Sequence, residues 1–273
     1  MPVYPSKLDP RVQDLMEIIF DGKMMAKTVT KLNYDVQKKP LGNLSTQVLK
    51  QGLKVLKQIE DMIKTGIGSK AKYEALSNEF YTHIPHNYGF AKLPVIDTLA
   101  MIKEKLELLE ILEDVEFASK VVLDETSSKI KQKKMNILDI HFESLKTSIT
   151  PISKSSDEWK WINQYVQNTH APTHDEYKMK VMDVFEIDRE AERKNFDASI
   201  GNRQFLWHGS RMTNWVGILS QGLRIAPPEA PVTGYMFGKG VYFADVSSKS
   251  ANYCCTTKEE NTVSSFAVCS DSS

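Results

Sequence analysis

Cysteine is scarce in this 273-residue chain, which has three, all near its C-terminal end. Cys254, Cys255 and Cys269 form neither a disulfide framework nor the Cys-x-x-Cys pairs of zinc sites, so we expect a reducing compartment. An excess of one charge is also missing, since 35 Lys and Arg balance 35 Asp and Glu. This balance argues against direct nucleic-acid binding by counterion release, and any such contact is expected outside this chain.

Long apolar runs and nucleotide-binding glycine motifs are missing too. No stretch approaches the ~18 apolar residues of a membrane span, and the start of the chain has no apolar run of signal-peptide length, so we expect no membrane partner. Residues 234–245 hold three glycines, but their spacing is that of neither a dinucleotide fingerprint nor a P-loop. Residues 66–70 (GIGSK) fail for lack of further glycines.

The first part of the chain has the pattern of a helical bundle. Apolar residues are 41% and charged residues 26% of the whole, as in folded globular proteins, and the length suggests two domains. In residues 45–65 apolar positions recur every three or four residues after the suitable N-cap Ser45. A second amphipathic helix is predicted from the cap Asp97 to Val115. Shorter helices are expected over residues 12–25 and 70–80.

A change in the residue pattern at residues 124–136 indicates a domain boundary. The segment loses the apolar period and carries four lysines, which we interpret as a solvated linker rather than a patch for an anionic partner. We therefore expect a helical domain over residues 5–123, a linker over 124–136 and a second domain over 137–273.

The second domain is predicted to mix strands and short helices. Alternation typical of strands occurs within residues 137–149 and 177–187, with a helix expected over 156–168 between them. Residues 205–207 and 241–243 are short apolar runs beside glycines that suit buried strands. The predicted fold class is α+β, with an N-terminal all-α bundle followed by a mixed α/β domain.

Candidate ligand-binding side chains follow directly after the run Phe205-Leu206-Trp207. A strand ending in His208-Gly209-Ser210 would put an imidazole, a backbone without Cβ and a hydroxyl at one strand mouth, although a structural histidine is an alternative interpretation. A short helix is expected next over residues 213–220, stopped by Gly222. Its N-terminus would offer free N–H groups to an anionic ligand.

A further helix is predicted to open at Ser247 as N-cap. Ser250 and Tyr253 would then lie three residues apart on one helical face, where a hydroxyl and an aromatic ring can meet the same flat ligand. An ordinary packed tyrosine is the alternative.

Long consecutive runs in this region resemble the donor site of poly(ADP-ribose) polymerases. The runs are LWHGS at 206–210, GILSQGLRIAPPEAP at 217–231, GYMFGKGVYFAD at 234–245 and SKSANYC at 248–254. PLGNLS at 40–45 and FYTHIPH at 80–86 resemble the helical regulatory domain of the DNA-dependent members of that family. The resemblance covers residues 8–254 and implies that the second domain is an ADP-ribosyltransferase domain.

The resemblance implies NAD as a substrate, with no metal, and assigns roles to the residues of these runs. His208 would bond the nicotinamide-ribose hydroxyl, while the Gly209 backbone and the Ser250 hydroxyl would hold the carboxamide. Tyr242 and Tyr253 would flank the nicotinamide ring, because aromatic faces attract a pyridinium cation. Lys249 would lie near the reacting centre and, with His208 and Tyr242, form the catalytic set. The rest of the expected NAD-binding set is Ser210, Asn214, Gly217, Arg224, Tyr235, Phe243 and Ala244.

One residue of the family pattern has no counterpart here. A glutamate on a later strand normally activates the acceptor, and the serine-rich stretch after Cys255 lacks the apolar strand that would carry it. Glu259 and Glu260 are present in that stretch, but nothing in the pattern puts them on that strand. We therefore expect a catalytic domain truncated at its C-terminus, with transferase activity lost or reduced. A catalytically dead isoform that binds partners or competes with an active protein is the alternative function.

Regulation and location are also implied by the resemblance. In the family, the helical domain blocks the donor site until DNA binding loosens it, and Glu107, Glu110 and Asp114 match the helix face next to that site. A merely solvated charged face is the alternative. The implied function is transfer of ADP-ribose from NAD to protein acceptors and growing polymer in the DNA damage response. The implied partners are protein acceptors and damaged DNA bound through domains outside this chain, and the implied location is the nucleus.

Overall fold

A computed structural model describes residues 4–133, 135–197, 199–233, 235, 237–255 and 266–269. The chain divides into two compact units. The first, called the site unit here, comprises residues 1–20, 125–222 and 242–273. The second, the bundle unit, comprises residues 21–124 together with residues 223–241. The second domain of the sequence therefore contributes one segment, residues 223–241, to the unit built mainly from the first.

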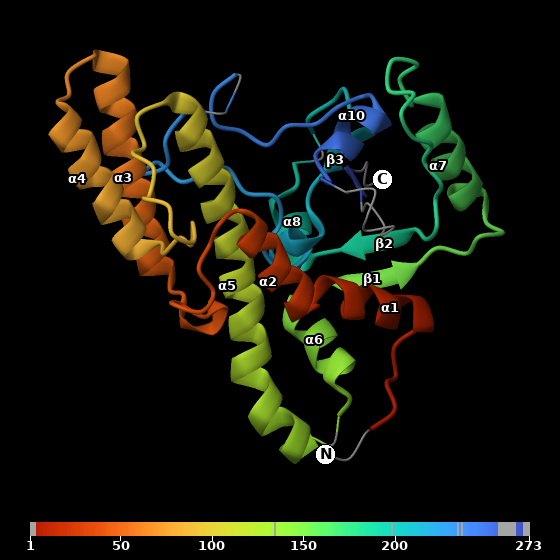
Figure 1. The fold of residues 1–273 in the computed structure, drawn as a ribbon. Coiled ribbons are helices and arrows are strands. Elements are labelled where there is room, and N and C mark those ends of the chain that lie inside the picture. Colours follow the sequence, from red (N-terminus) through yellow and green to blue (C-terminus); the bar gives the residue numbers. More distant parts are fainter. Residues whose placement is uncertain are drawn as a thin grey trace. The chain divides into compact units, whose positions relative to one another are not determined.

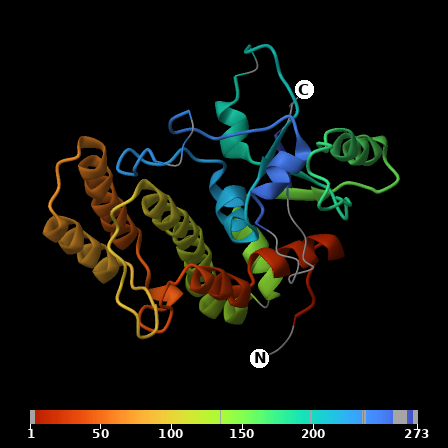
Figure 2. The ribbon, with the colours of Figure 1, turned by 45° about the horizontal axis from the view of Figure 1, so that its top comes forward.

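Helices make up most of the bundle unit, as the sequence predicts, and Figures 1 and 2 show them in red, orange and yellow to yellow-green. They are α2 (Gly22–Lys31), the short 3₁₀ turn η1 (Leu41–Asn43), α3 (Thr46–Thr65), α4 (Lys70–His83) and the first part of α5 (Leu99–Lys133). The Ser45 side chain caps α3 by accepting from the Val48 amide. At α5 the expected cap is wrong by one residue, because the Thr98 hydroxyl, not Asp97, accepts from the Met101 amide.

The bundle core is built from the apolar positions of these helices. Leu56 and Ile59 of α3 are completely buried, and Leu109 of α5 is 2% exposed. Gly52 lets the helices approach closely, since a Cβ there would lie 3.2 Å from Ile84 and 3.4 Å from Leu109. The amphipathic pattern thus identified the buried stripes of both long helices.

Two further segments of the first 136 residues differ from the expected form. The helix predicted over residues 12–25 is two helices, α1 (Pro10–Ile19) and α2, because the Asp21 carboxylate accepts from the Lys23 and Met24 amides and starts a new helix. The expected linker over residues 124–136 is helical up to Lys133, as the last part of α5. A helix can continue without an apolar period, because its backbone hydrogen bonds do not depend on one.

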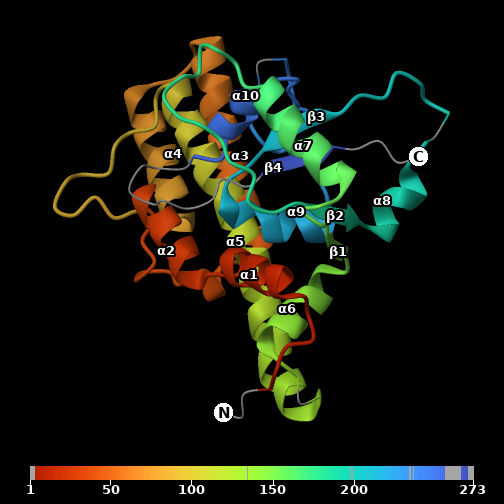
Figure 3. The same ribbon diagram turned by 90° about the vertical axis from the view of Figure 1, so that its right-hand side faces the viewer.

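Short elements form the site unit (Figure 3). Strands β1 (Ser148–Pro151) and β2 (Phe185–Asp188) pair antiparallel with Ile149 opposite Ile187, and strands β3 (Leu206–Gly209) and β4 (Phe266–Cys269) pair antiparallel with Trp207 opposite Val268. The helices are α1, α6 (Ile137–Leu145), α7 (Asp157–Asn168), α8 (Glu190–Asn195), the 3₁₀ turn η2 (Met212–Asn214), α9 (Trp215–Gln221) and α10 (Ser247–Asn252). The mixed composition agrees with the predicted α+β class.

The strand predictions succeed only in part. The start of the run 137–149 is helix α6, because Asn136 caps it at the Leu138 amide. Residues 241–243 form no strand, and only Ala244 makes an isolated bridge, to Trp207. Conversely, the serine-rich stretch expected to hold no apolar strand forms β4, since Phe266 and the next three residues are apolar and hydrogen-bond along β3.

Candidate functional site

Strand β3 is the element on which the predicted site is built. Its Trp207 is 1% exposed, and its indole N–H donates to the Thr169 hydroxyl at 3.0 Å. The backbones of Trp207 and Ala244 exchange two hydrogen bonds of 2.7 and 2.9 Å. These contacts set the orientation of the next two residues, His208 and Gly209, relative to residues 242–244.

The His208 ring lies beside residues 242–243. Its Nδ1 is 3.0 Å from the Tyr242 carbonyl oxygen, and its ring centre is 5.7 Å from that of Phe243. Because a carbonyl oxygen can only accept, Nδ1 carries the proton in this contact. In the neutral ring Nε2 is then an acceptor, suited to a ligand hydroxyl.

Gly209 lies so close to helix α10 that a side chain cannot be placed there. A Cβ on Gly209 would lie 1.8 Å from the Ser250 carbonyl oxygen and 3.3 Å from Cys254 Sγ. Ser250 is 3% exposed, and its hydroxyl donates to the Trp207 carbonyl at 3.0 Å. A serine hydroxyl that donates once keeps lone pairs with which to accept from a ligand amide. The backbone of Gly209 and the side chain of Ser250 are thus brought together.

Buried hydroxyls attach α10 to α7 and to the residues that follow it. The Ser247 hydroxyl donates to the Val166 carbonyl at 2.8 Å, so Ser247 is a helix residue and not the predicted N-cap. Ser248 Oγ lies 2.9 Å from the Ala171 amide and 2.8 Å from His174 Nδ1. A shallow hollow beside this anchorage is lined by His174, Lys249, Asn252 and Tyr253.

The expected adenosine-side residues lie in both units. In the site unit, the Asn214 amide donates to the Ser210 hydroxyl at 3.0 Å, and Gly217 is buried in α9. The helix predicted over residues 213–220 is present as η2 and α9, and it ends at Gly222, which has φ +78°. Arg224 and Tyr235 belong to segment 223–241 and therefore to the bundle unit.

Helix α5 presents carboxylates to Arg224 and Tyr235 within the bundle unit. The Tyr235 hydroxyl donates to Glu110 Oε1 at 3.0 Å. Arg224 lies 3.3 Å from a Glu113 oxygen and 3.9 Å from an Asp114 oxygen. Burial raises the pKa of Asp114 to about 8, Arg224 opposes this rise, and the neighbours Glu113 and Glu110 add to it. Two of the three predicted interface carboxylates, Glu110 and Asp114, thus contact or approach expected NAD-binding residues.

Comparison with known proteins now adds to this geometry. Residues 156–270 match the poly(ADP-ribose) polymerase catalytic domain, and residues 6–142 match the poly(ADP-ribose) polymerase regulatory domain. The chain is 48% identical over 262 residues to poly(ADP-ribose) polymerase 2 of Homo sapiens, covering 96% of this chain and 44% of that protein.

The chain belongs to the poly(ADP-ribose) polymerase family. It is also 46% identical over 257 residues to poly(ADP-ribose) polymerase 1 of Gallus gallus, and 45% identical over 253 residues to poly(ADP-ribose) polymerase 2 of Arabidopsis thaliana. These alignments cover 93% and 91% of this chain, but 25% and 39% of the two relatives. This polymerase-family chain thus spans less than half the length of the curated relatives named here.

Not every predicted site residue of this polymerase-family chain is gathered at β3. Ser250 and Tyr253 were expected on one helical face, yet Ser250 is buried while Tyr253 is 65% exposed. Tyr242 and Phe243, expected in a buried strand, are 41% and 39% exposed. Aromatic rings held open in this way remain accessible to a ligand. Glu259 and Glu260 lie outside the described residues.

Sequence reasoning missed two sets of residues. Ser248 and His174 position α10, and no local pattern marks them because their contact joins residues 74 apart in sequence. Glu60 is the second omission. Its neighbours Lys57 and Lys64, at three and four residues along α3, are the one signal that could have indicated a charge cluster.

Two features are absent from the described residues. No three His, Cys, Asp or Glu side chains of that part of the chain gather as a metal ion would require. Within the same part, no helix combines the length and apolar character needed to cross a bilayer.

Proposed function

We propose that this chain is the regulatory and catalytic region of an NAD-dependent ADP-ribosyltransferase that modifies protein acceptors and growing polymer. The observation that carries the proposal is the pairing at the end of β3. There His208 is oriented by the Tyr242 carbonyl, and Gly209 packs directly on Ser250. These are the residues that the family resemblance assigns to the nicotinamide half of NAD.

The residues of β3 and α10 suit the two ends of a nicotinamide riboside. The Gly209 backbone and the Ser250 hydroxyl would hold the carboxamide, which fixes the rotation of the ring. Nε2 of His208 would accept from a ribose hydroxyl, and the open rings of Tyr242 and Tyr253 would face the pyridinium cation. Such contacts align the bond between nicotinamide and ribose, whose cleavage passes ADP-ribose to an acceptor. Lys249, in the hollow with Tyr253, would lie near the reacting centre.

Regulation is proposed through the bundle unit. Its carboxylates Glu110, Glu113 and Asp114 engage Tyr235 and Arg224, which the resemblance assigns to NAD binding. While these contacts last, the Tyr235 hydroxyl and the Arg224 guanidinium are directed to carboxylates of α5 and would have to be released to contact the dinucleotide. We further propose a nuclear role in the DNA damage response, with damaged DNA bound by domains outside this chain.

Binding of two ligands tests the proposal. Isothermal titration should detect benzamide, which mimics nicotinamide, and Tyr242→Ala should weaken it by about 3- to 30-fold through loss of a ring contact. His208→Ala should leave benzamide binding nearly unchanged and weaken NAD by about 3- to 10-fold through loss of a hydrogen bond. His83→Ala, on α4 in the bundle unit, serves as the histidine control.

Two outcomes would redirect the proposal. If benzamide binds with equal affinity to the Tyr242→Ala protein, the site is not at β3. If both ligands bind as expected but labelled NAD is not consumed, the chain acts as a binding or competing module.

A further inference from the structure

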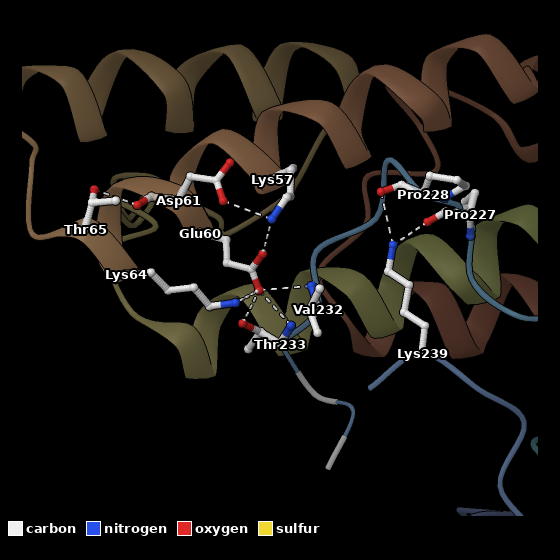
Figure 4. Close-up of polar contacts among 10 residues, drawn as sticks. All are labelled: Lys57, Glu60, Asp61, Lys64, Thr65, Pro227, Pro228, Val232, Thr233 and Lys239. Atoms are coloured by element: carbon white, nitrogen blue, oxygen red, sulfur yellow. Dashed lines mark hydrogen bonds and ion pairs between the residues drawn. The ribbon is translucent and has the colours of Figure 1, made fainter. Parts of the chain in front are cut away.

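Glu60 of helix α3 has a buried carboxylate with an unusual number of donors, all within the bundle unit (Figure 4). Its side chain is completely buried. Oε1 accepts from the Val232 amide at 3.0 Å, from the Thr233 amide at 2.7 Å and from the Thr233 hydroxyl at 2.5 Å. Lys64 Nζ lies 2.9 Å from the same oxygen, and Lys57 Nζ lies 2.9 Å from Oε2. Neither oxygen is left without a donor.

Ionisation of Glu60 follows from these donors. Burial by itself would raise the pKa of the carboxyl group. The hydrogen bonds from Thr233, Lys64 and Lys57 outweigh burial and hold its pKa well below the ordinary value. The group is therefore a carboxylate at neutral pH, and hydrogen bonds to an ionised acceptor are the stronger kind.

The other end of the same contact is the middle of segment 223–241. Val232 and Thr233 have successive amides that point at one oxygen, so the local backbone direction is set by Glu60 and not by a regular element. Before them Ala230 is buried, and beyond them Lys239 Nζ donates to the Pro227 and Pro228 carbonyls at 2.6 and 3.1 Å. The segment is thus closed on itself by Lys239 and attached to α3 by Glu60 (Figure 4).

We propose that Glu60 is a positioning residue for segment 223–241, fixing residues 232–233 on α3 and so holding Arg224 and Tyr235 in their contacts with α5. The first half of this inference concerns the segment alone. The second half rests on the proposed function, because it makes Glu60 part of the hold that keeps Arg224 and Tyr235 from NAD. The contacts that keep Arg224 and Tyr235 from NAD would then include Glu60 of α3 as well as the carboxylates of α5.

Exchange of backbone amide protons, followed by NMR on the whole chain, tests the first half. Glu60→Gln keeps the side-chain volume but loses the charge, and should speed exchange at Val232 and Thr233 by about 10- to 100-fold, with buried α3 amides such as Leu56 unchanged. Asp61→Asn is the matched control. Asp61 also pairs with Lys57 at 2.9 Å but has no hydrogen bond or ion pair with the described residues of the segment, so its loss should leave Val232 and Thr233 protected.

A second pair of variants guards against a merely structural effect. Thr233→Val removes the hydroxyl at constant shape and should speed exchange at the Thr233 amide, whereas Thr233→Ser retains the hydroxyl and should preserve protection. The effects of Glu60→Gln and Thr233→Val should not add when combined, since each breaks the same contact. Additive effects, or unchanged exchange in Glu60→Gln, would overturn the inference.

NAD binding tests the second half. Glu60→Gln should raise the affinity for NAD several-fold and leave that for benzamide unchanged, because benzamide needs only site-unit residues. Faster amide exchange with unchanged NAD affinity would overturn the regulatory half alone. Failure of benzamide to bind the wild-type chain would instead count against the proposed function and leave the amide result standing.

Discussion

Two regions of the bundle unit hold segment 223–241 with carboxylates, and their carboxylates behave in opposite ways. On α3, burial of Glu60 is outweighed by the donors of Thr233, Lys64 and Lys57, and its pKa is lowered. On α5, burial raises the pKa of Asp114 to about 8, because the one guanidinium, 3.9 Å away, does not offset burial and the two neighbouring carboxylates. The comparison teaches that the number of donors at a buried carboxylate, and not burial itself, decides its charge.

The largest expected effect comes from the core that both regions share. Leu56→Ala should lower the free energy of unfolding of the bundle by ~2–5 kcal/mol, because it leaves a cavity at a completely buried position of α3. Both regions should weaken together, which urea unfolding followed by helical circular dichroism would measure. Ile67→Ala, at a residue 76% exposed, is the aliphatic control and should change little. An equal loss in both variants would show that α3 is not packed as described.

The next effect separates the two regions by pH. Between the ordinary Asp value of 3.8 and about 8, folded Asp114 binds a proton that the unfolded chain releases. The free energy of unfolding should therefore fall as the pH rises through this window, by up to ~1.4 kcal/mol per pH unit. Glu60 contributes the opposite sign, since its stabilisation is lost only as the pH falls below its ordinary range. Burial lowers the pKa of His86 from 6.5 to about 4, which gives a slope of the opposite sign below about pH 7. Between about pH 7 and about pH 8, the slope thus reports on Asp114.

Urea midpoints measured across that range check the assignment. Asp114→Asn should flatten the slope and gain stability relative to the wild-type chain at the alkaline end. Asp61→Asn, at a carboxylate 58% exposed, should keep the wild-type slope. A slope that survives in Asp114→Asn would assign the proton to another group, with Glu110 as the first candidate because burial raises its pKa too.

The smallest effect is expected at Arg224. Its side chain is 44% exposed and its partner Glu113 is 41% exposed, so solvent screens the pair. Arg224→Gln should lower the free energy of unfolding by about 0–1 kcal/mol near neutral pH. It should also move the pH range over which Asp114 titrates to higher pH, because the positive charge that opposes the rise of its pKa is gone. Arg193→Gln, which breaks an exposed pair with Asp188 in the site unit, is the control. If the pH range over which Asp114 titrates were unchanged in Arg224→Gln, the two side chains would not interact.

The sequence by itself determined the long helices and singled out the residues that we propose for the site at β3. Helices α3 and α5 were predictable because their apolar residues repeat at the helical period, and that period needs no knowledge of the partner surface. His208, Gly209 and Ser250 were found through consecutive runs that resemble a family. Gly209 also has a local physical reason, since no side chain fits there.

Only the tertiary structure decided the features that depend on contacts between residues far apart in the sequence. Residues 241–243 are as apolar as a buried strand, but they form no strand, and the bridge to Trp207 is made by Ala244, while Tyr242 and Phe243 are partly exposed. The α6 segment alternates like a strand, yet the Asn136 cap makes it a helix. Glu60 is an ordinary helix glutamate in the sequence, and its role depends on amides 172 and 173 residues away. Hydrogen bonds over such separations leave no periodic trace in the chain, so the fold alone can reveal them.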